Sequence, residues 1–178
     1  LLRSAARLED LLATTGFLGS ARGGLEWTTR HPDVDEEVAR YLREAHYHPQ
    51  PRLHEGRILV EEGVLAAMDV SDGLAGDLAK LCRSSGVSAR LYADRIPVHQ
   101  LLRQTFPEAY LDLALSGGED YLLLFTANAE TVGKVMPGLS EGASVIGEII
   151  AGDPGRVTIV DHAGVETTLS SAGWDHFG

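Results

Sequence analysis

Length and composition exclude several classes of protein. The chain has 178 residues, of which 44% are hydrophobic, 6% aromatic and 23% charged, as in a folded domain with an aliphatic core and unlike a disordered or coiled-coil chain. The formal charge is -11 and the basic residues form no cluster, which argues against nucleic acid or an anionic membrane as a partner. A phosphate ligand would therefore arrive with a cation.

Cysteine usage and hydropathy indicate the compartment. Cys82 is the only cysteine, so no internal disulfide can form, and no apolar run approaches the roughly 20 residues that a membrane helix needs. We therefore expect a cytoplasmic protein. The chain opens on Leu1 to Ser4 with neither an initiator Met nor a signal-peptide pattern. We interpret it as a fragment of a longer protein, with residues 1–178 as a single domain.

The first third of the chain predicts one strand and two helices. Residues 10–15 favour a strand, and the glycines within 16–24 indicate a loop-rich segment, because glycine permits tight turns. Apolar residues recur at helical spacing over 34–47, where a Pro-rich stretch ends the helix. A second helix is predicted over 53–62, with Gly63 as its C-terminal cap.

The remainder alternates strands and helices. Residues 64–70 form an apolar run that we expect to be a buried strand. It turns into a helix that carries Cys82, interpreted as a core residue, on its apolar face. Further elements are predicted as strands over 87–92, 120–126, 145–150, 156–160 and 165–169, the last two as a hairpin, and a helix over 128–136. The fold class is therefore α/β (α+β), a mixed sheet flanked by helices.

Two carboxylates and a hydroxyl follow the strand over 64–70. Asp69, Ser71 and Asp72 lie where the strand ends and a helix begins. Carboxylates there can hold Mg²⁺, and the free amides of a helix start attract phosphate oxygens, which is what phosphoryl transfer needs. The alternative is that Ser71 or Asp72 simply caps the helix, an interaction that stabilises it by roughly 1 kcal/mol.

A second acidic cluster follows a Gly-Gly turn. Glu119 and Asp120 come directly before an apolar strand, and the glycines let backbone amides approach a ligand. The alternative is an ordinary turn with solvated acids. The glycines of 16–24 lack the pattern of a phosphate-binding loop, and His46 and His48 lie on different helical faces, which argues against a metal pair.

Three motifs, in the same order, resemble the thiamine-monophosphate kinase family of the aminoimidazole-ribotide synthetase-like ATP-binding superfamily. They are MDVSDGL at 68–74, ALSGGEDY at 114–121 and GWDHF at 173–177, and the segments 3–16 and 48–52 are also similar. The resemblance covers the C-terminal domain of the family. It implies that the family's N-terminal domain, with further metal ligands and the central barrel of a homodimer, is absent from this chain.

The resemblance also implies roles for individual residues. Asp69 and Asp72 resemble the family's magnesium ligands at the catalytic centre, and Arg3 and Ser71 resemble its ATP contacts. The reaction implied is transfer of the ATP γ-phosphoryl group to thiamine monophosphate, giving thiamine diphosphate and ADP. Without the other domain, we expect the fragment by itself to be inactive.

Two residues are implied as contacts to thiamine monophosphate. Glu119 and Trp174 match the family's substrate contacts, and an acid with an aromatic ring suits a cationic heteroaromatic ligand. Two alternatives stay open: another ATP-dependent synthetase of the superfamily, and a non-catalytic scaffold or regulatory domain. The second is suggested by Ser20, which stands where the family often has Asp.

Overall fold

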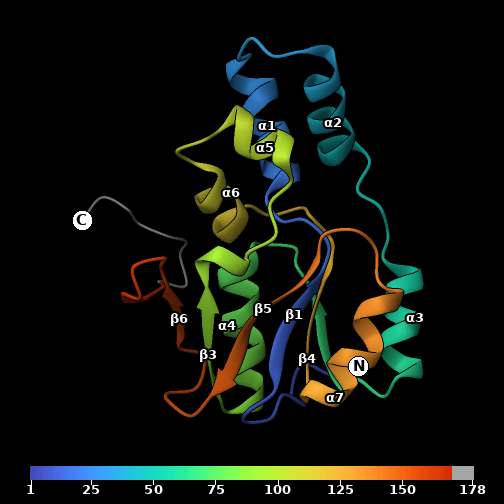
Figure 1. Cartoon of the computed structure of the whole chain (residues 1–178), viewed down its shortest axis with the longest axis vertical. Helices are drawn as coiled ribbons and strands as arrows, with labels where there is room; N and C mark the ends of the chain where they lie inside the picture. Colours follow the sequence, from blue (N-terminus) through green and yellow to red (C-terminus); the bar gives the residue numbers. More distant parts are fainter. Residues whose placement is uncertain (170–178) are drawn as a thin grey trace.

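The computed structural model describes residues 1–169, and these form a mixed sheet with helices on both faces (Figure 1). Within this part of the chain, the sheet has seven strands in the order β2-β4-β1-β5-β3-β6-β7. All neighbouring pairs are antiparallel except β3 and β6, which run parallel. The predicted fold class, a mixed sheet flanked by helices, is confirmed.

The described residues form seven strands, seven α-helices and two short 3₁₀ turns. The strands are β1 (Leu11–Thr15), β2 (Ala66–Asp69), β3 (Ser88–Tyr92), β4 (Leu123–Ala127), β5 (Ala143–Ile150), β6 (Val157–Val160) and β7 (Glu166–Thr168). The helices are α1 (Ser20–Arg30), α2 (Glu36–Tyr47), α3 (Leu53–Glu61), α4 (Leu74–Ser85), α5 (Gln100–Thr105), α6 (Tyr110–Ser116) and α7 (Ala129–Val135), with short 3₁₀ turns η1 (Ala93–Arg95) and η2 (Met136–Gly138). The β6–β7 hairpin is confirmed.

Helix α4 covers one face of the sheet. Leu74, Leu78, Leu81 and Cys82 recur at helical spacing and are fully buried. They belong to the larger of two apolar clusters, which also contains Leu124 from β4. The apolar site of Cys82 raises the pKa of its thiol to about 12, so it is a core residue, as its position in the pattern predicted.

Helices α3 and α7 cover the opposite face. Phe125, the neighbour of Leu124 in β4, points into a second cluster that holds Leu59 of α3 and Val132 and Val135 of α7. Successive side chains of a strand point to opposite faces of a sheet. Strand β4 therefore contributes Leu124 to the first cluster and Phe125 to the second. Both faces are thereby closed by apolar packing, which fixes the strands whose ends carry the acids.

Helices α1, α2 and α5 gather at one end of the sheet, where the segment with four glycines was predicted to be a loop (Figure 1). That prediction is wrong from Ser20 onward, because α1 begins there. A Cβ at Gly24 would lie 2.2 Å from the Leu42 carbonyl oxygen, and one at Gly23 would lie 2.2 Å from Leu102. These glycines serve close helix packing, which a sequence pattern does not distinguish from loop flexibility.

Strand β2 is shorter than predicted and lies at the edge of the sheet. It pairs only with β4 among the strands, while Leu2 forms a single bridge to Ala66. Its apolar residues are nevertheless buried by the two helical layers, whereas Leu65, just before the strand, is 52% exposed. In the described part of the chain, no helix is long and apolar enough to cross a membrane.

Candidate active site

The side chain of Asp77 holds the turn from β2 into α4. Asp77 is buried in the first turns of α4 and its Oδ2 accepts the backbone amides of Ser71, at 2.8 Å, and Asp72, at 2.9 Å. Lys80 donates from Nζ to Asp77 Oδ1, at 2.8 Å, and to Asp72 Oδ2, at 2.6 Å. The turn is therefore fixed by one carboxylate that bonds two of its amides.

The exposed acids of this turn point to solvent. Asp69 is exposed at the end of β2, and the Asp72 side chain is 69% exposed. The hydrogen bond and charge of Lys80 hold the pKa of Asp72 below its usual range, so that carboxyl is ionised at neutral pH. The N-cap residue of α4 is Gly73, at φ 114°, with no side-chain cap bond, so the capping alternative for Ser71 and Asp72 is wrong.

A second turn, residues 116–121 between α6 and β4, lies against the first. The Glu119 amide donates to the Ser71 carbonyl at 2.9 Å, and the Tyr121 amide donates to the Val70 carbonyl at 3.0 Å. Gly118 is required here, because a Cβ at that position would lie 2.5 Å from the Ser71 oxygen. The structure thus brings Glu119 beside Ser71.

The second turn is strained. Glu119 has φ 72° and Tyr121 has φ 50°, both in the left-handed region. Such backbone conformations in residues other than glycine cost about 1–3 kcal/mol each and persist only where surrounding contacts enforce them. The Tyr121 hydroxyl donates to Glu119 Oε2 at 2.8 Å, which orients the exposed carboxylate. The hydrogen bond to Glu119 also raises the pKa of Tyr121, so the hydroxyl keeps its proton.

Asp120, between these two strained residues, points the other way. Its Oδ2 accepts the Gly19 amide at 2.6 Å and its Oδ1 accepts the Ala21 amide at 3.0 Å, so it reaches the start of α1. Close packing raises the pKa of Asp120 to about 6, although these amides and the charge of Arg52 lower it. The reading of this segment as an ordinary turn with two solvated acids is wrong for Asp120.

Sequence reasoning gave no role to Asp77, Lys80 or Asp120. The signal for Asp77 and Lys80 is local, since an acid and a base three residues apart in the first turns of α4 can reach back to the preceding turn. Asp120 bonds amides that precede it by 99 and 101 residues. No spacing in one sequence reports such a contact.

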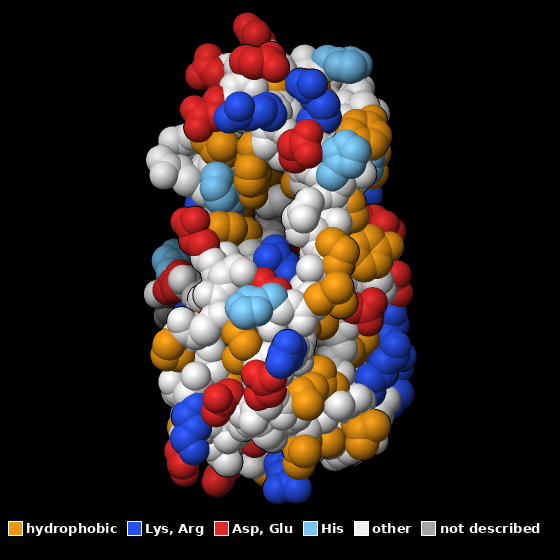
Figure 2. Space-filling view, turned by 90° about the vertical axis from the view of Figure 1, so that its right-hand side faces the viewer, with side chains coloured by type: hydrophobic (Ala, Val, Ile, Leu, Met, Phe, Trp, Pro, Cys, Tyr) orange, Lys and Arg blue, Asp and Glu red, His pale blue; other side chains and the backbone are white. Residues whose placement is uncertain are grey.

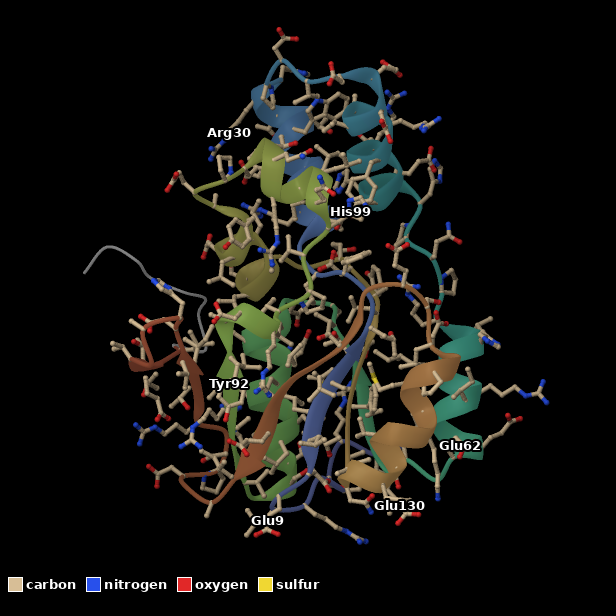
Figure 3. All side chains as sticks on the ribbon, in the orientation of Figure 1. Glu9, Arg30, Glu62, Tyr92, His99 and Glu130 are labelled. Carbon is tan, nitrogen blue, oxygen red and sulfur yellow. The ribbon has the colours of Figure 1, made fainter. Side chains whose placement is uncertain are left out.

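A cavity of about 240 Å³ lies beside Asp120, between the helical end and the sheet. Its walls come from the β1–α1 connection, α2 and the α2–α3 connection, and include Phe17, Tyr41, Glu44, His48, Arg52 and Asp120. Figure 2 shows the face that carries the α2–α3 connection, which is hollowed at mid-height. Above it, His99, labelled in Figure 3, stacks on Tyr41 with ring centroids 4.1 Å apart.

The acids of the candidate site provide oxygen donors for a divalent cation. Within residues 1–169, no three His, Cys, Asp or Glu side chains lie close enough together to hold a metal ion. Asp69 and Asp72 are two exposed carboxylates, of which Asp72 is paired with Lys80 through Oδ2, and Mg²⁺ is usually bound by one or two carboxylates together with water and substrate phosphates. The two carboxylates therefore fit part of a magnesium site, which would need further ligands to be complete.

One predicted site residue, Arg3, stands apart from this group. The Arg3 carbonyl accepts a hydrogen bond from Ser85 Oγ, at 2.9 Å, and Ser85 ends α4. Since α4 rises about 1.5 Å per residue, Arg3 lies roughly 17 Å along the helix from the turn that carries Asp72. The structure does not bring Arg3 to that turn, and its ATP contact stays a prediction. Trp174 lies outside the described residues.

Comparison with known proteins gives the family. Residues 10–160 match the family model described as AIR synthase related protein, C-terminal domain. The chain belongs to this family. The match spans both turns of the candidate site and ends at Val160, the last residue of β6.

Individual relatives are more specific. The chain is 35% identical over 182 residues to thiamine-monophosphate kinase from Salmonella typhimurium, covering 99% of this chain and 55% of that protein. It is similar to the crystal structure of thiamine-monophosphate kinase from Stenotrophomonas maltophilia, with a TM-score of 0.80 and 32% identity over 89% of this chain and 52% of that one. The chain thus spans about half the length of the curated relatives it matches.

Two further structures bear on ligands and on the fold. A structure described as AaThiL complexed with AMPPCP and TMP has a TM-score of 0.81 and 30% identity, over 98% of this chain and 53% of that one. The hydrogenase maturation protein HypE from E. coli has a TM-score of 0.72 at 18% identity, over 99% of this chain and 53% of that one, a likeness of fold alone.

Proposed function

We propose that this chain supplies part of the MgATP and substrate site of a kinase that transfers the γ-phosphoryl group of ATP to thiamine monophosphate. The observation that carries the proposal is the junction of the two turns, in which the Glu119 amide bonds the Ser71 carbonyl. The likeness to a structure complexed with AMPPCP and TMP supports the choice of ligands.

The residues of the junction would contact different substrates. In the reaction, an oxygen of the thiamine monophosphate phosphate attacks the γ-phosphorus of ATP, the bond to the β,γ-bridging oxygen breaks, and ADP leaves. Ser71 would contact ATP phosphate oxygens with its hydroxyl. Glu119, oriented by Tyr121, would contact the cationic heteroaromatic part of thiamine monophosphate. No covalent enzyme intermediate is needed, since positioning and charge stabilisation dominate phosphoryl transfer.

Asp69 and Asp72 would hold Mg²⁺ through their exposed carboxylates, which are the oxygen ligands this ion prefers. When bound, the ion would neutralise the charge that develops on the transferred phosphoryl group. Lys80 has a second function in this arrangement. It bonds Asp72 and keeps that carboxylate ionised and oriented toward the turn.

The activity is proposed for a protein of the relatives' length. Further metal and nucleotide ligands would come from a domain that precedes residue 1, and Arg3 would contact ATP in that context. The homodimer and the cytoplasmic location are proposals of the same kind. They rest on the family resemblance, on the single cysteine and on the acidic composition.

The test is formation of thiamine diphosphate from thiamine monophosphate, ATP and Mg²⁺, measured by chromatography. The protein encoded by the complete gene is compared with residues 1–178. We expect product from the complete protein and none from residues 1–178 alone. If the complete protein makes no thiamine diphosphate but hydrolyses ATP with other acceptors, the reading as another synthetase of the superfamily replaces the kinase. If it uses no ATP at all, the scaffold reading replaces both.

A further inference from the structure

Glu119 occupies a backbone conformation that it would not adopt by itself. Its φ of 72° and the φ of 50° at Tyr121 enclose Asp120 between two left-handed residues. Relaxation of either residue to a negative φ would swing the Glu119 carboxylate away from the β2–α4 turn. Some contact must therefore hold the segment in this form.

Backbone contacts hold only one side of the segment. The amides of Glu119 and Tyr121 bond the carbonyls of Ser71 and Val70, and these contacts tie the turn to the end of β2. On the opposite side, the tie is the Asp120 side chain, which accepts two amides from the start of α1. The segment is thus clamped between two elements, and Asp120 forms the side-chain half of the clamp.

Both Asp120 oxygens are occupied by protein donors. Oδ2 lies 2.6 Å from the Gly19 nitrogen, and Oδ1 lies 3.0 Å from the Ala21 nitrogen. Gly19 has φ 81° and no space for a Cβ, since one would lie 2.7 Å from the Ala114 nitrogen, so the donor side of the clamp is fixed as well. Each Asp120 oxygen thus accepts an amide of the α1 start, and through these contacts the side chain holds the segment that carries Glu119.

We propose that Asp120 is a positioning residue, which holds Glu119 in its strained conformation so that the carboxylate faces the substrate beside the β2–α4 turn. This inference rests on the proposed function. It assigns the affinity for thiamine monophosphate to the pair of Asp120 and Glu119, while the nucleotide and metal contacts depend on the separate clamp that Asp77 forms on Ser71 and Asp72.

The test uses the protein encoded by the complete gene and the nearly isosteric variant Asp120→Asn. An asparagine offers a single acceptor oxygen, so one of the two amides loses its partner. We expect the KM for thiamine monophosphate to rise at least about 10-fold, and the KM for ATP to change by less than about twofold. The reason is that a misplaced side chain weakens binding only of the substrate that it contacts. KM does not depend on the concentration of folded enzyme, so partial unfolding leaves it unchanged.

The matched control is Asp10→Asn. Asp10 is buried and accepts the Arg7 amide and the Thr126 hydroxyl, but it lies at the opposite end of the sheet, next to Glu9 in Figure 3. Its variant removes the charge of another carboxylate that accepts a backbone amide, and we expect wild-type KM values for both substrates. A rise in the KM for thiamine monophosphate in Asp10→Asn equal to that in Asp120→Asn would show that any loss of a buried acid has this effect and would overturn the proposal.

A double-mutant cycle with Glu119→Gln separates positioning from a general structural role. If Asp120 acts through Glu119, Asp120→Asn raises KM much less in the Glu119→Gln background than in the wild type. Gly118→Ala, which presses the same segment away from Ser71, should show the same dependence on Glu119. Independent, multiplying effects in both cycles would contradict the proposal. An inactive wild type would instead refute the proposed function, so the two failures are distinguishable.

Discussion

The two turns of the candidate site are held by the same device at different ranges. In the β2–α4 turn, Asp77 bonds the amides of residues five and six positions before it. In the α6–β4 turn, Asp120 bonds amides about a hundred positions before it, at the start of α1. Each turn also presents an exposed acid, Asp72 or Glu119, on the outside.

The two turns therefore differ in how much of the fold their contacts require. The Asp77 clamp can form as soon as α4 forms, because all its partners lie within one strand-turn-helix unit. The Asp120 clamp exists only when α1 and β4 have been brought together by the whole fold. We therefore expect the nucleotide side of the site to depend on one local unit, and the substrate side to depend on tertiary structure.

The largest expected effect sharpens the division of roles. Asp72→Asn in the complete protein removes a metal charge with little change in volume, and we expect kcat to fall at least about 100-fold, with the fold intact. Kinetics at saturating substrates measure the fall, and circular dichroism checks the fold. Turnover at the wild-type rate by a folded variant would remove the metal role from Asp72.

The next effect tests the local clamp. Asp77→Asn loses the ionic contact with Lys80 and weakens two charge-assisted bonds to Ser71 and Asp72, so we expect the free energy of unfolding to fall by about 1.5–3 kcal/mol. Urea denaturation measures the change. The control is Glu130→Gln, which breaks only an exposed ion pair with Lys134 and should change stability by less than about 0.5 kcal/mol. Equal changes in the two variants would argue against the clamp.

The long-range clamp has a signature in pH. The pKa of Asp120 is raised from its ordinary 3.8 to about 6 in the folded protein, so between these values the folded state binds the proton more tightly than the unfolded state does. This contribution to stability is complete below about pH 4 and is lost as the pH rises through about 6. We expect Asp120→Asn to abolish this component, so that unfolding free energies of the variant fall less between pH 4 and 6.5. If the unfolding free energies of the wild type and the variant fall equally with pH, Asp120 is not the source of this pH dependence.

The smallest effect concerns orientation of the Glu119 carboxylate. Tyr121→Phe removes the hydroxyl that donates to Glu119 and leaves the left-handed backbone in place. The bond is exposed, so we expect the KM for thiamine monophosphate to rise by only about two- to threefold. A larger rise than in Asp120→Asn would mean that the hydroxyl, and not the clamp, fixes the carboxylate.

The sequence predicted the parts of this molecule that depend on local pattern. The apolar face of α4 and the helix α3 were predicted because helical spacing is a local feature, although the C-cap of α3 is Glu62, one residue before the predicted cap Gly63. The glycines of α1 were misread as a loop, because Gly23 and Gly24 are explained by Leu102 and Leu42, which lie far away in the sequence.

The candidate site divides in the same way. Asp69, Ser71, Asp72 and Glu119 were predicted as site residues from two acidic clusters and from the resemblance of the motifs around them, and the structure places the two turns side by side. The strain at Glu119 and the bonds of Asp120 could not be found, since a left-handed backbone in a residue other than glycine is imposed by tertiary contacts and leaves no mark in the local pattern.

The most direct test of the central claim compares Asp72→Asn and Glu119→Gln in the complete protein, by steady-state kinetics with thiamine monophosphate and ATP varied in turn. The account predicts that Asp72→Asn lowers kcat and leaves the KM for thiamine monophosphate near the wild-type value. It predicts that Glu119→Gln raises that KM and leaves the KM for ATP unchanged. Wild-type kinetics in both variants, or the same pattern of change in both, would contradict a site divided between the two turns.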